Sequence, residues 1–290
     1  MSKVPSIIVE GVDDIPIYDE LVNNIEHDYK VFAVENLEGF NAGCDGVISA
    51  MNYIDALPRS RHDYEKFIIG IIDKDVKDFR NEIPDNKYIF PLKYYSMESH
   101  FICKDLIIDL VKYSTKTTAS LRDLQLENLI FEKIMTSLNN LYYISLDALY
   151  GSLDSNYKSD ISYSATVGRF KDPVLLNKIE LKKTQLQEFA DSKGISFNIE
   201  SMKKFIKGKW LLDVFCIEFE KKLKELPLEC TSGAIQSCQC CISEAEEKCL
   251  YKIKEGVNHK SIKTYLMTST NHNEFGYVKE RLLAMSSRAA

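Results

Sequence analysis

The chain has 290 residues and a formal net charge of −6, and 45% of its residues are hydrophobic and 28% charged. This composition is typical of globular proteins, and the length suits one large domain or two smaller ones. No apolar run approaches the ~18 residues that a membrane-spanning helix needs. Glu10, Asp13 and Asp14 follow the N-terminus too closely for a signal peptide. The eight cysteines are therefore expected to be reduced thiols, and the protein to be cytoplasmic and not membrane-bound.

Charge is unevenly distributed along the chain. Acidic residues are concentrated in the first 100 residues, and the rest of the chain carries a small excess of lysine and arginine. Many of these lysines lie between Lys178 and Glu225. An acidic first part suits a cation site, and lysine-rich helices suit either a polyanionic ligand or an ordinary solvated face.

The first 95 residues alternate short apolar segments with amphipathic ones. We expect strands at 6–11, 29–34, 67–75 and 88–90, helices at 15–22 and 47–57, and a glycine-containing loop at 39–46. Strand–helix alternation predicts an α/β fold with a Rossmann-like, mostly parallel four-stranded sheet.

After Tyr95 the pattern becomes helical. Helices are expected at 97–111, 121–150, 175–190, 209–226 and 275–285, with a long irregular loop at 154–173. The sequence therefore predicts an α/β catalytic domain at 1–112 and a mostly helical domain at 113–290, which would serve substrate binding and dimer or partner contacts.

The central apolar run, Phe67 to Asp75, ends in Asp73 and Asp75. Side chains alternate along a strand, so both carboxylates are expected on the same side. Ligands of open α/β sheets bind at the carboxyl ends of the strands, and Glu10 closes the first strand. Carboxylates that face one another repel unless a cation lies between them, and Mg²⁺ or Mn²⁺ is the usual cation for all-oxygen ligands.

These acids can be assigned expected roles. Catalysis is expected from Glu10, Asp73 and Asp75, with Glu10 as a metal ligand or a general acid or base. The expected metal ligands are Glu10, Asp14, Asp73, Asp75 and Glu98. Helix capping is an alternative for Asp13 and Asp14, and capping or a structural ion pair is an alternative for Glu98.

Several lysines are candidates for phosphate contacts. Lys74 and Lys77 flank the central acids, where they either contact nucleic acid or offset the carboxylates. Two cations beside a helix N-terminus form an anion site, and Lys207-Gly208-Lys209 precedes a predicted helix. The expected nucleic-acid-binding residues are Lys74, Lys77, Lys203, Lys204, Lys207 and Lys209.

The pairing of Val9-Glu10-Gly11-Val12-Asp13-Asp14 with Ile72-Asp73-Lys74-Asp75 resembles a TOPRIM domain. Gly43-Cys44-Asp45-Gly46, Tyr95-Ser96-Met97-Glu98 and Lys207-Gly208-Lys209 resemble the AriB-like group of TOPRIM nucleases, the effectors of the PARIS anti-phage defence system. Val47 stands where the family loop often carries a lysine. The resemblance implies a toxic Mg²⁺-dependent endoribonuclease that cleaves tRNA, acts as a homodimer and works beside an ABC-type ATPase partner subunit.

Other functions fit parts of the pattern. An OLD-type TOPRIM DNA endonuclease and a non-catalytic partner of an ABC-type ATPase remain open alternatives. Response-regulator receivers also place acids as at Glu10, Asp14 and Asp73, but they need a lysine after a fifth strand, which is not evident. Haloacid-dehalogenase phosphatases carry their Asp-x-Asp on the first strand, whereas here it follows the third. The absence of a GxxxxGK[ST] motif argues against an ATPase.

Five cysteines gather near the end of the chain, at Cys230, Cys238, Cys240, Cys241 and Cys249, with His259 nearby. Zinc ligands usually occur as C-x₂₋₄-C pairs, and the seven-residue gaps on either side of this group are too long for a zinc knuckle. The sequence therefore favours buried thiols that pack helices, and does not predict Zn²⁺ at Cys230, Cys238, Cys241 and Cys249.

Overall fold

The structure is a computed structural model that describes residues 4–23, 25, 28–58 and 64–289, with only the backbone for 286–289. The chain forms two units, Met1–His100 with Met267–Ala290, and Phe101–Leu266. Residues 1–3, the first part of the segment that argued against a signal peptide, lie outside the described residues. Within the described ranges, no helix combines the length and apolar character that a membrane crossing requires.

The first unit is built on a four-stranded sheet. Its strands are β1 (Ser6–Val9), β2 (Lys30–Ala33), β3 (Ile68–Ile72) and β4 (Ile89–Pro91). Their order is β2-β1-β3-β4, and every neighbouring pair is parallel. The predicted α/β fold with a parallel sheet is confirmed. β2 and β3 lie on opposite sides of β1, so the strand order reverses between β1 and β3. Open α/β sheets bind ligands outside the carboxyl ends of the strands at such a point.

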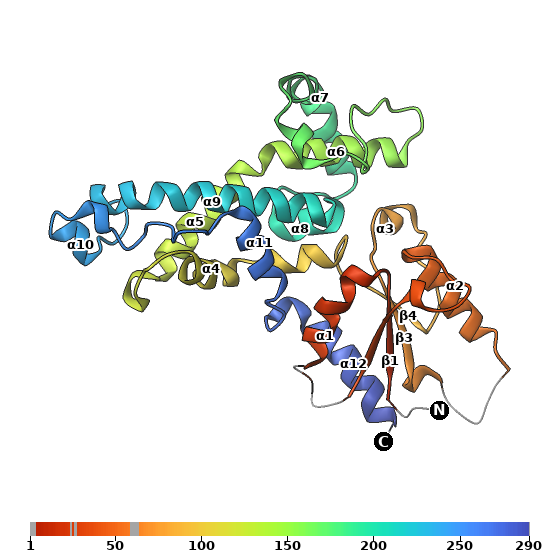
Figure 1. Cartoon of the computed structure of the whole chain (residues 1–290). Helices are drawn as coiled ribbons and strands as arrows, with labels where there is room; N and C mark the ends of the chain where they lie inside the picture. Colours follow the sequence, from red (N-terminus) through yellow and green to blue (C-terminus); the bar gives the residue numbers. More distant parts are fainter. Residues whose placement is uncertain (1–3, 24, 26–27, 59–63, 290) are drawn as a thin grey trace. The chain divides into compact units, whose positions relative to one another are not determined.

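Helices cover both faces of this sheet. α1 (Ile15–Asn23) and α2 (Cys44–Asp55) lie on opposite faces (Figure 1). Close packing of α2 on β3 requires a glycine at Gly70, because a Cβ there would lie 2.7 Å from both Val47 Cγ1 and Met51 Cγ. This fit places the N-terminus of α2 beside the carboxyl end of the sheet.

The C-terminal helix α12 (Gly276–Ala289) belongs to the first unit. The Tyr94 hydroxyl donates to Glu274 Oε2 at 2.7 Å, and the Tyr29 hydroxyl donates to the Leu282 carbonyl at 2.8 Å. The predicted division at residue 112 therefore differs from the observed one, which falls after His100 and returns the C-terminal segment to the sheet.

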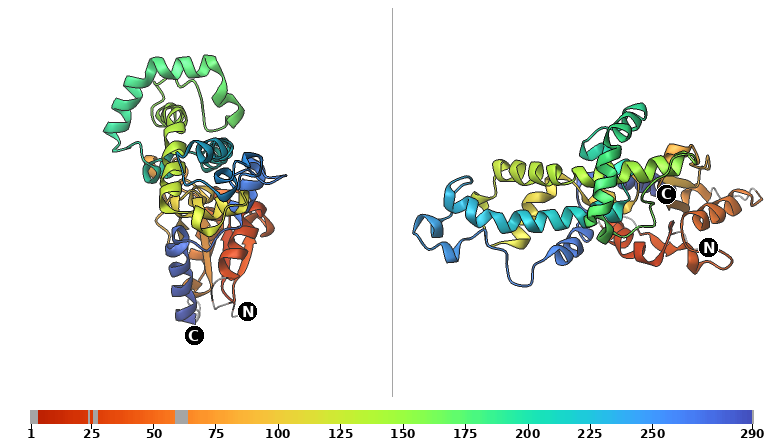
Figure 2. Two further views of the ribbon diagram at one scale, coloured as in Figure 1. Left: turned by 90° about the vertical axis from the view of Figure 1, so that its left-hand side faces the viewer. Right: turned by 90° about the horizontal axis from the view of Figure 1, so that it is seen from above.

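The second unit is helical. Its helices are α4 (Ile107–Ser114), α5 (Leu124–Ser137), α6 (Asn139–Leu153), α7 (Pro173–Ser192), α8 (Ile199–Phe205), α9 (Gly208–Ser232), α10 (Gln239–Ile242) and α11 (His259–Met267). α5 lies beside the long helix α9 (Figures 1 and 2). The helix expected at 121–150 is interrupted at Leu138, and α8 was not predicted.

The first unit also contains α3 (Lys77–Arg80). Short 3₁₀ helices connect the elements at Val12–Asp14, Val34–Asn36, Tyr64–Lys66, Met97–Phe101, Lys104–Leu106, Ala119–Leu121, Val167–Lys171, Glu246–Lys248 and Asn273–Phe275.

A buried carboxylate organises the irregular segment that follows α6. Asp147 accepts hydrogen bonds from the Tyr157 hydroxyl at 2.6 Å, the Ser159 hydroxyl at 2.7 Å and the Asp160 backbone N–H at 2.7 Å. Lys182 Nζ lies 3.1 Å from the same carboxylate. The predicted long loop is thus present, and it is ordered because its polar groups satisfy a charge that is withdrawn from water.

Candidate active site

Two acids meet where β1 and β3 end. Glu10 directly follows β1, and Asp73 directly follows the neighbouring strand β3. The Asp73 backbone N–H donates to Glu10 Oε1 at 2.8 Å. Parallel pairing from Ser6 and Ile68 onwards fixes this register. The two acids that the sequence predicts at neighbouring strand ends are therefore adjacent, at the point where the strand order reverses.

The segment after β4 completes one side of the site. The Met97 backbone N–H donates to Asp73 Oδ1 at 3.0 Å, which holds the carboxylate toward the 3₁₀ helix Met97–Phe101. Glu98 lies in that helix and accepts a hydrogen bond from the Ser96 hydroxyl at 2.5 Å. Its negative charge acts on Asp73 and contributes to raising the pKa of that carboxyl group. Glu98 is thus part of the same electrostatic group as Asp73.

Asp75 reaches the site in a different way from the one predicted. β3 ends at Ile72, so strand alternation does not extend to Asp75. Its backbone has a positive φ of 49°, in the left-handed region that non-glycine residues rarely adopt. The Asp75 N–H donates to the Tyr95 carbonyl at 2.8 Å, which fixes this turn. The argument from alternation is wrong, although the negative charge of Asp75 still acts on both Glu10 and Asp73.

Asp14 has a structural contact as well as an electrostatic one. Its Oδ2 accepts the Gly11 backbone N–H at 3.1 Å, at the start of the 3₁₀ helix Val12–Asp14. The capping alternative is therefore confirmed for Asp14. Its charge also contributes to the raised pKa of Glu10, whereas Asp13 is exposed. We call Glu10, Asp14, Asp73, Asp75 and Glu98 the acidic cluster.

Two acids of the acidic cluster, Glu10 and Asp73, hold their protons more tightly than isolated acids do. Burial, followed by the negative charges of Asp75 and Asp14, raises the pKa of Glu10 to about 7, although the bond from the Asp73 N–H opposes the shift. Burial, followed by the charges of Glu10 and Glu98, raises the pKa of Asp73 well above its usual range. Local positive charge is thus too weak to compensate these carboxylates. A divalent cation would supply the missing charge, and the all-oxygen donor set suits Mg²⁺ or Mn²⁺.

The acidic cluster is a loose group. Among the described residues, a set of three or more His, Cys, Asp or Glu ligand atoms within 4.8 Å of one another occurs at Cys230, Cys238, Cys241 and Cys249, and not at these carboxylates. The carboxylates would therefore have to move closer together before three of them could contact one ion.

The sequence interpretation missed Cys44, at the start of α2. Its thiol favours the charged form of Glu10 and so lowers the pKa of that carboxyl group, and burial followed by the charge of Glu10 raises the pKa of the thiol to about 12. Cys44 is therefore a neutral donor at neutral pH. The preceding Gly43 has a φ of 94° and donates its N–H to the Glu10 carbonyl at 2.7 Å. The only sequence signal for this arrangement was the glycine-containing loop before α2.

Three tyrosines adjoin the acidic cluster and were also missed. Tyr18 comes from α1, Tyr95 from the segment after β4, and Tyr277 from α12. Burial raises the pKa of each, and the charge of Asp73 contributes in all three cases. Their hydroxyls are therefore neutral near the site. Tyr277 could not be assigned from sequence because α12 lies far along the chain.

The two predicted lysines of the first unit pair with acids of that unit. Lys74 Nζ lies 3.3 Å from Asp78 Oδ2, and Lys77 Nζ lies 3.4 Å from Asp45 Oδ1. Burial lowers the pKa of Lys77, but Cys44, Asp45 and Asp75 outweigh that effect and the pKa is raised. Lys77 thus supplies positive charge beside the acidic cluster, as the sequence allowed.

The predicted lysine group of the second unit is only partly exposed. Lys203 is fully buried with its Nζ 3.3 Å from Glu200 Oε1, so its prediction as a surface phosphate contact is wrong. Lys207 Nζ donates to the Tyr163 carbonyl at 2.8 Å. Lys204 and Lys209 are exposed. α9 begins at Gly208, as expected, and the lysines of this predicted group that reach the surface are Lys204, Lys209 and the half-buried Lys207.

No protein-family model matches the chain, and no curated protein matches it in sequence. The sheet and the residues at its carboxyl edge are therefore the basis for any functional proposal.

Proposed function

We propose that the protein is a Mg²⁺-dependent TOPRIM nuclease that cleaves RNA, with tRNA as the favoured substrate. The observation that supports this most directly is the contact between Glu10 and Asp73 at neighbouring strand ends. Burial and the negative charges of Asp75 and Asp14 raise the pKa of Glu10 to about 7, and a bound cation would offset this cost of ionisation. The order of Glu10 before Asp73 and Asp75 along the chain is also that of the TOPRIM motifs.

The chemistry follows from the residues of the acidic cluster. A cation bound by Glu10, Asp73 and Asp75 would lower the pKa of an attacking water and stabilise the charge that develops on phosphate oxygens. Glu10 Oε1 accepts the Asp73 N–H, so a proton on neutral Glu10 resides on Oε2. Without a cation on Glu10 itself, its pKa of about 7 would instead suit the alternative role of general acid or base at neutral pH. The Met97 N–H orients Asp73 for its role as a ligand.

The finer parts of the proposal depend on the resemblance to AriB-like nucleases. These are the tRNA substrate, the role as toxic effector in anti-phage defence, the homodimer and the ABC-type ATPase partner. Twofold homodimers are the commonest soluble oligomers. Sedimentation equilibrium tests the dimer, because a species that cleaves at full rate with the mass of one 33.3 kDa chain would exclude it.

Substrate class is tested by incubating the protein with total tRNA and, separately, with plasmid DNA, each with Mg²⁺ or Mn²⁺. We expect tRNA to be cleaved and plasmid to remain intact. Cleavage of plasmid alone would favour the OLD-type alternative. Cleavage of neither substrate, even at high protein concentration, would favour a non-catalytic partner of an ATPase.

Two variants connect the activity to the site. Glu10→Gln and Asp73→Asn remove a ligand charge with little change in shape, and each is expected to abolish cleavage. Asp55→Asn is the matched control, because Asp55 is an exposed acid at the opposite end of α2. Equal activity in all three variants would show that a contaminating nuclease or another site is responsible.

A further inference from the structure

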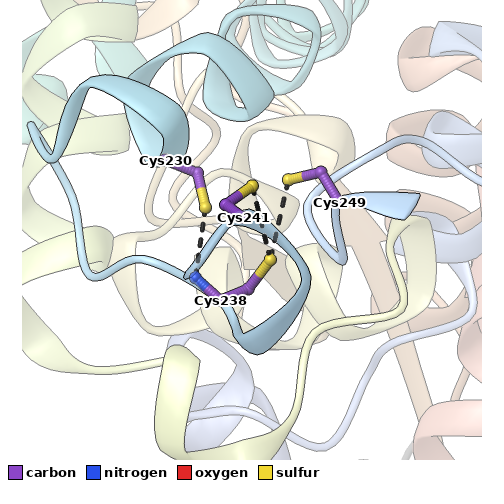
Figure 3. Close-up of side chains that lie close together, drawn as sticks. All are labelled: Cys230, Cys238, Cys241 and Cys249. Atoms are coloured by element: carbon purple, nitrogen blue, oxygen red, sulfur yellow. Dashed lines mark hydrogen bonds between the residues drawn. The ribbon is translucent and has the colours of Figure 1, made fainter. Parts of the chain in front are cut away.

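Four cysteine side chains converge in the second unit. Cys230 lies in the last turn of α9, Cys238 and Cys241 lie at the two ends of the first turn of α10, and Cys249 follows the 3₁₀ helix Glu246–Lys248. Figure 3 shows their sulfur atoms pointing toward a common centre. All four sulfurs lie within 4.8 Å of one another. We call these residues the cysteine quartet.

The spacing of the sulfurs is close to that of a tetrahedral metal site. A Zn–S distance of ~2.3 Å gives a tetrahedron whose sulfur–sulfur edges are ~3.8 Å. Cys238 Sγ lies 3.7 Å from Cys241 Sγ and 3.9 Å from Cys249 Sγ. All four cysteines are free, without a disulfide. Little movement is therefore needed for one ion to contact all four sulfurs.

Backbone N–H groups are directed at the sulfurs, as is usual around thiolate ligands. The Cys238 N–H donates to Cys230 Sγ at 3.2 Å, and the Leu250 N–H donates to Cys238 Sγ at 3.5 Å. Ordinary thiols packed as apolar side chains do not need such donors.

The surrounding segment has little apolar core of its own. Between Thr231 and Leu250, only Ile235, Cys238 and Cys249 are buried. α10 has four residues, none of them buried. Short segments without a sufficient core are commonly held by disulfides or a structural metal. The cysteine quartet occupies the position that such a link requires, between the end of α9 and the chain that follows it.

The sequence argued against zinc because the gaps from Cys230 to Cys238 and from Cys241 to Cys249 are long. The structure accommodates both gaps. The chain reverses after α9 at Gly233, which has a φ of 75°, and a second reversal occurs at Glu244, with a φ of 58°. The informative pair was Cys238-x₂-Cys241, which has the usual zinc-ligand spacing and was obscured by the intervening Cys240.

We propose that Cys230, Cys238, Cys241 and Cys249 bind one Zn²⁺ ion as a structural site. Four sulfur ligands complete the tetrahedral coordination of zinc and leave no position for water or substrate, which is the arrangement of structural zinc sites. Each ligand gives up its thiol proton on binding, so the affinity increases with pH. The site would fix the end of α9 to the segment around α10, independently of the proposed nuclease activity.

The test is the zinc content of the full-length protein, purified without chelating resins or added metal and measured by inductively coupled plasma mass spectrometry. We expect one zinc per chain. After the zinc is removed under reducing conditions, Co²⁺ should restore a one-to-one complex with strong thiolate-to-cobalt charge-transfer bands and the intense ligand-field bands of tetrahedral coordination. Both measurements use the wild-type protein, so neither depends on whether a variant folds.

Two variants assign the ligands. Cys238→Ser should lose the zinc, whereas Cys240→Ser should retain it, because Cys240 is partly exposed like Cys241 but lies outside the cysteine quartet. Hydrogen exchange of residues 230–252 should accelerate when zinc is removed. Protein that contains no zinc and does not bind Co²⁺ would overturn the proposal. The same holds for iron at the site, for a disulfide within the cysteine quartet, or for a Cys240→Ser variant that loses zinc equally.

Discussion

Neutralising Glu10 should stabilise the metal-free protein at alkaline pH. Glu10→Gln keeps the size of the side chain and an oxygen that can accept the Asp73 N–H, now found 2.8 Å from Glu10 Oε1. What the change removes is a negative charge that is partly buried beside Asp75 and Asp14. Loss of catalysis and gain of stability are therefore expected together, as is common where acids are crowded for function.

The magnitude follows from the pKa of Glu10, which is raised from 4.5 to about 7 in the folded protein. A carboxyl group with a raised pKa binds more protons when folded, so the free energy of unfolding falls as the pH rises from about 4.5 to about 7. The difference corresponds to at most about 3 kcal/mol. Near pH 5 folded Glu10 is largely protonated and resembles glutamine, so the two proteins should then differ little.

Hydrogen exchange of the β1 and β3 amides measures this effect, because it reports the opening of the first unit by itself. At pH 8, without divalent cations, Glu10→Gln should slow exchange by up to about a hundredfold, since each ~1.4 kcal/mol is a factor of ten. Mg²⁺ should slow exchange in the wild type and have little effect on the variant, because a ligand stabilises only the state that binds it.

Asp55→Asn provides the control, since Asp55 is exposed and lies outside the acidic cluster. It should leave exchange unchanged at both pH values. If Glu10→Gln exchanged as fast as the wild type at pH 8, the negative charge of Glu10 would not destabilise the folded protein. The argument that a cation would relieve the repulsion within the acidic cluster would then fail.

Three further predictions concern other parts of the chain. Asp147→Asn should lower the stability of the helical unit by about 1–3 kcal/mol, because an amide cannot accept all the hydrogen bonds that the buried carboxylate accepts from Tyr157, Ser159 and Asp160. Urea unfolding followed by the fluorescence of the single, buried Trp210 measures this, and an unchanged midpoint would contradict it. Gly70→Ala should cost about 1–3 kcal/mol through overpacking against α2, visible as faster β3 exchange, and unchanged exchange would show that α2 yields. Replacing Lys204 and Lys209 by Gln should weaken tRNA binding and reduce the salt slope by about two counterions, whereas an unchanged slope would make them a solvated face.

The sheet was largely predictable because its signals are local. Strongly apolar segments such as Ile68–Ile72 alternate with amphipathic helices, and the order of elements implies a parallel sheet. Glu10 and Asp73 could be placed together for the same reason, since adjacent parallel strands end at the same edge. The position of Asp75 could not be derived, because it depends on a left-handed turn rather than on strand pleating.

Features that depend on long-range packing were beyond sequence reasoning. The C-terminal segment joins the first unit through side-chain contacts such as the hydrogen bond from Tyr94 to Glu274. No pattern in the local sequence predicts such contacts. The burial of Lys203 likewise reflects the packing of α8, and a lysine on a short polar helix gives no sign of it. The four cysteines of the cysteine quartet come together through two chain reversals, which their spacing in the sequence does not reveal.

The central claim is that the acidic cluster cleaves RNA with the help of a divalent cation. The most direct test is single-turnover cleavage of end-labelled tRNA by the wild type and by Glu10→Gln, Asp73→Asn and Asp55→Asn, with Mg²⁺ and with a chelator. We predict discrete cleavage by the wild type and Asp55→Asn in Mg²⁺ only, and none by the other two variants. Cleavage that persists in Glu10→Gln, or in the presence of the chelator, would contradict the account.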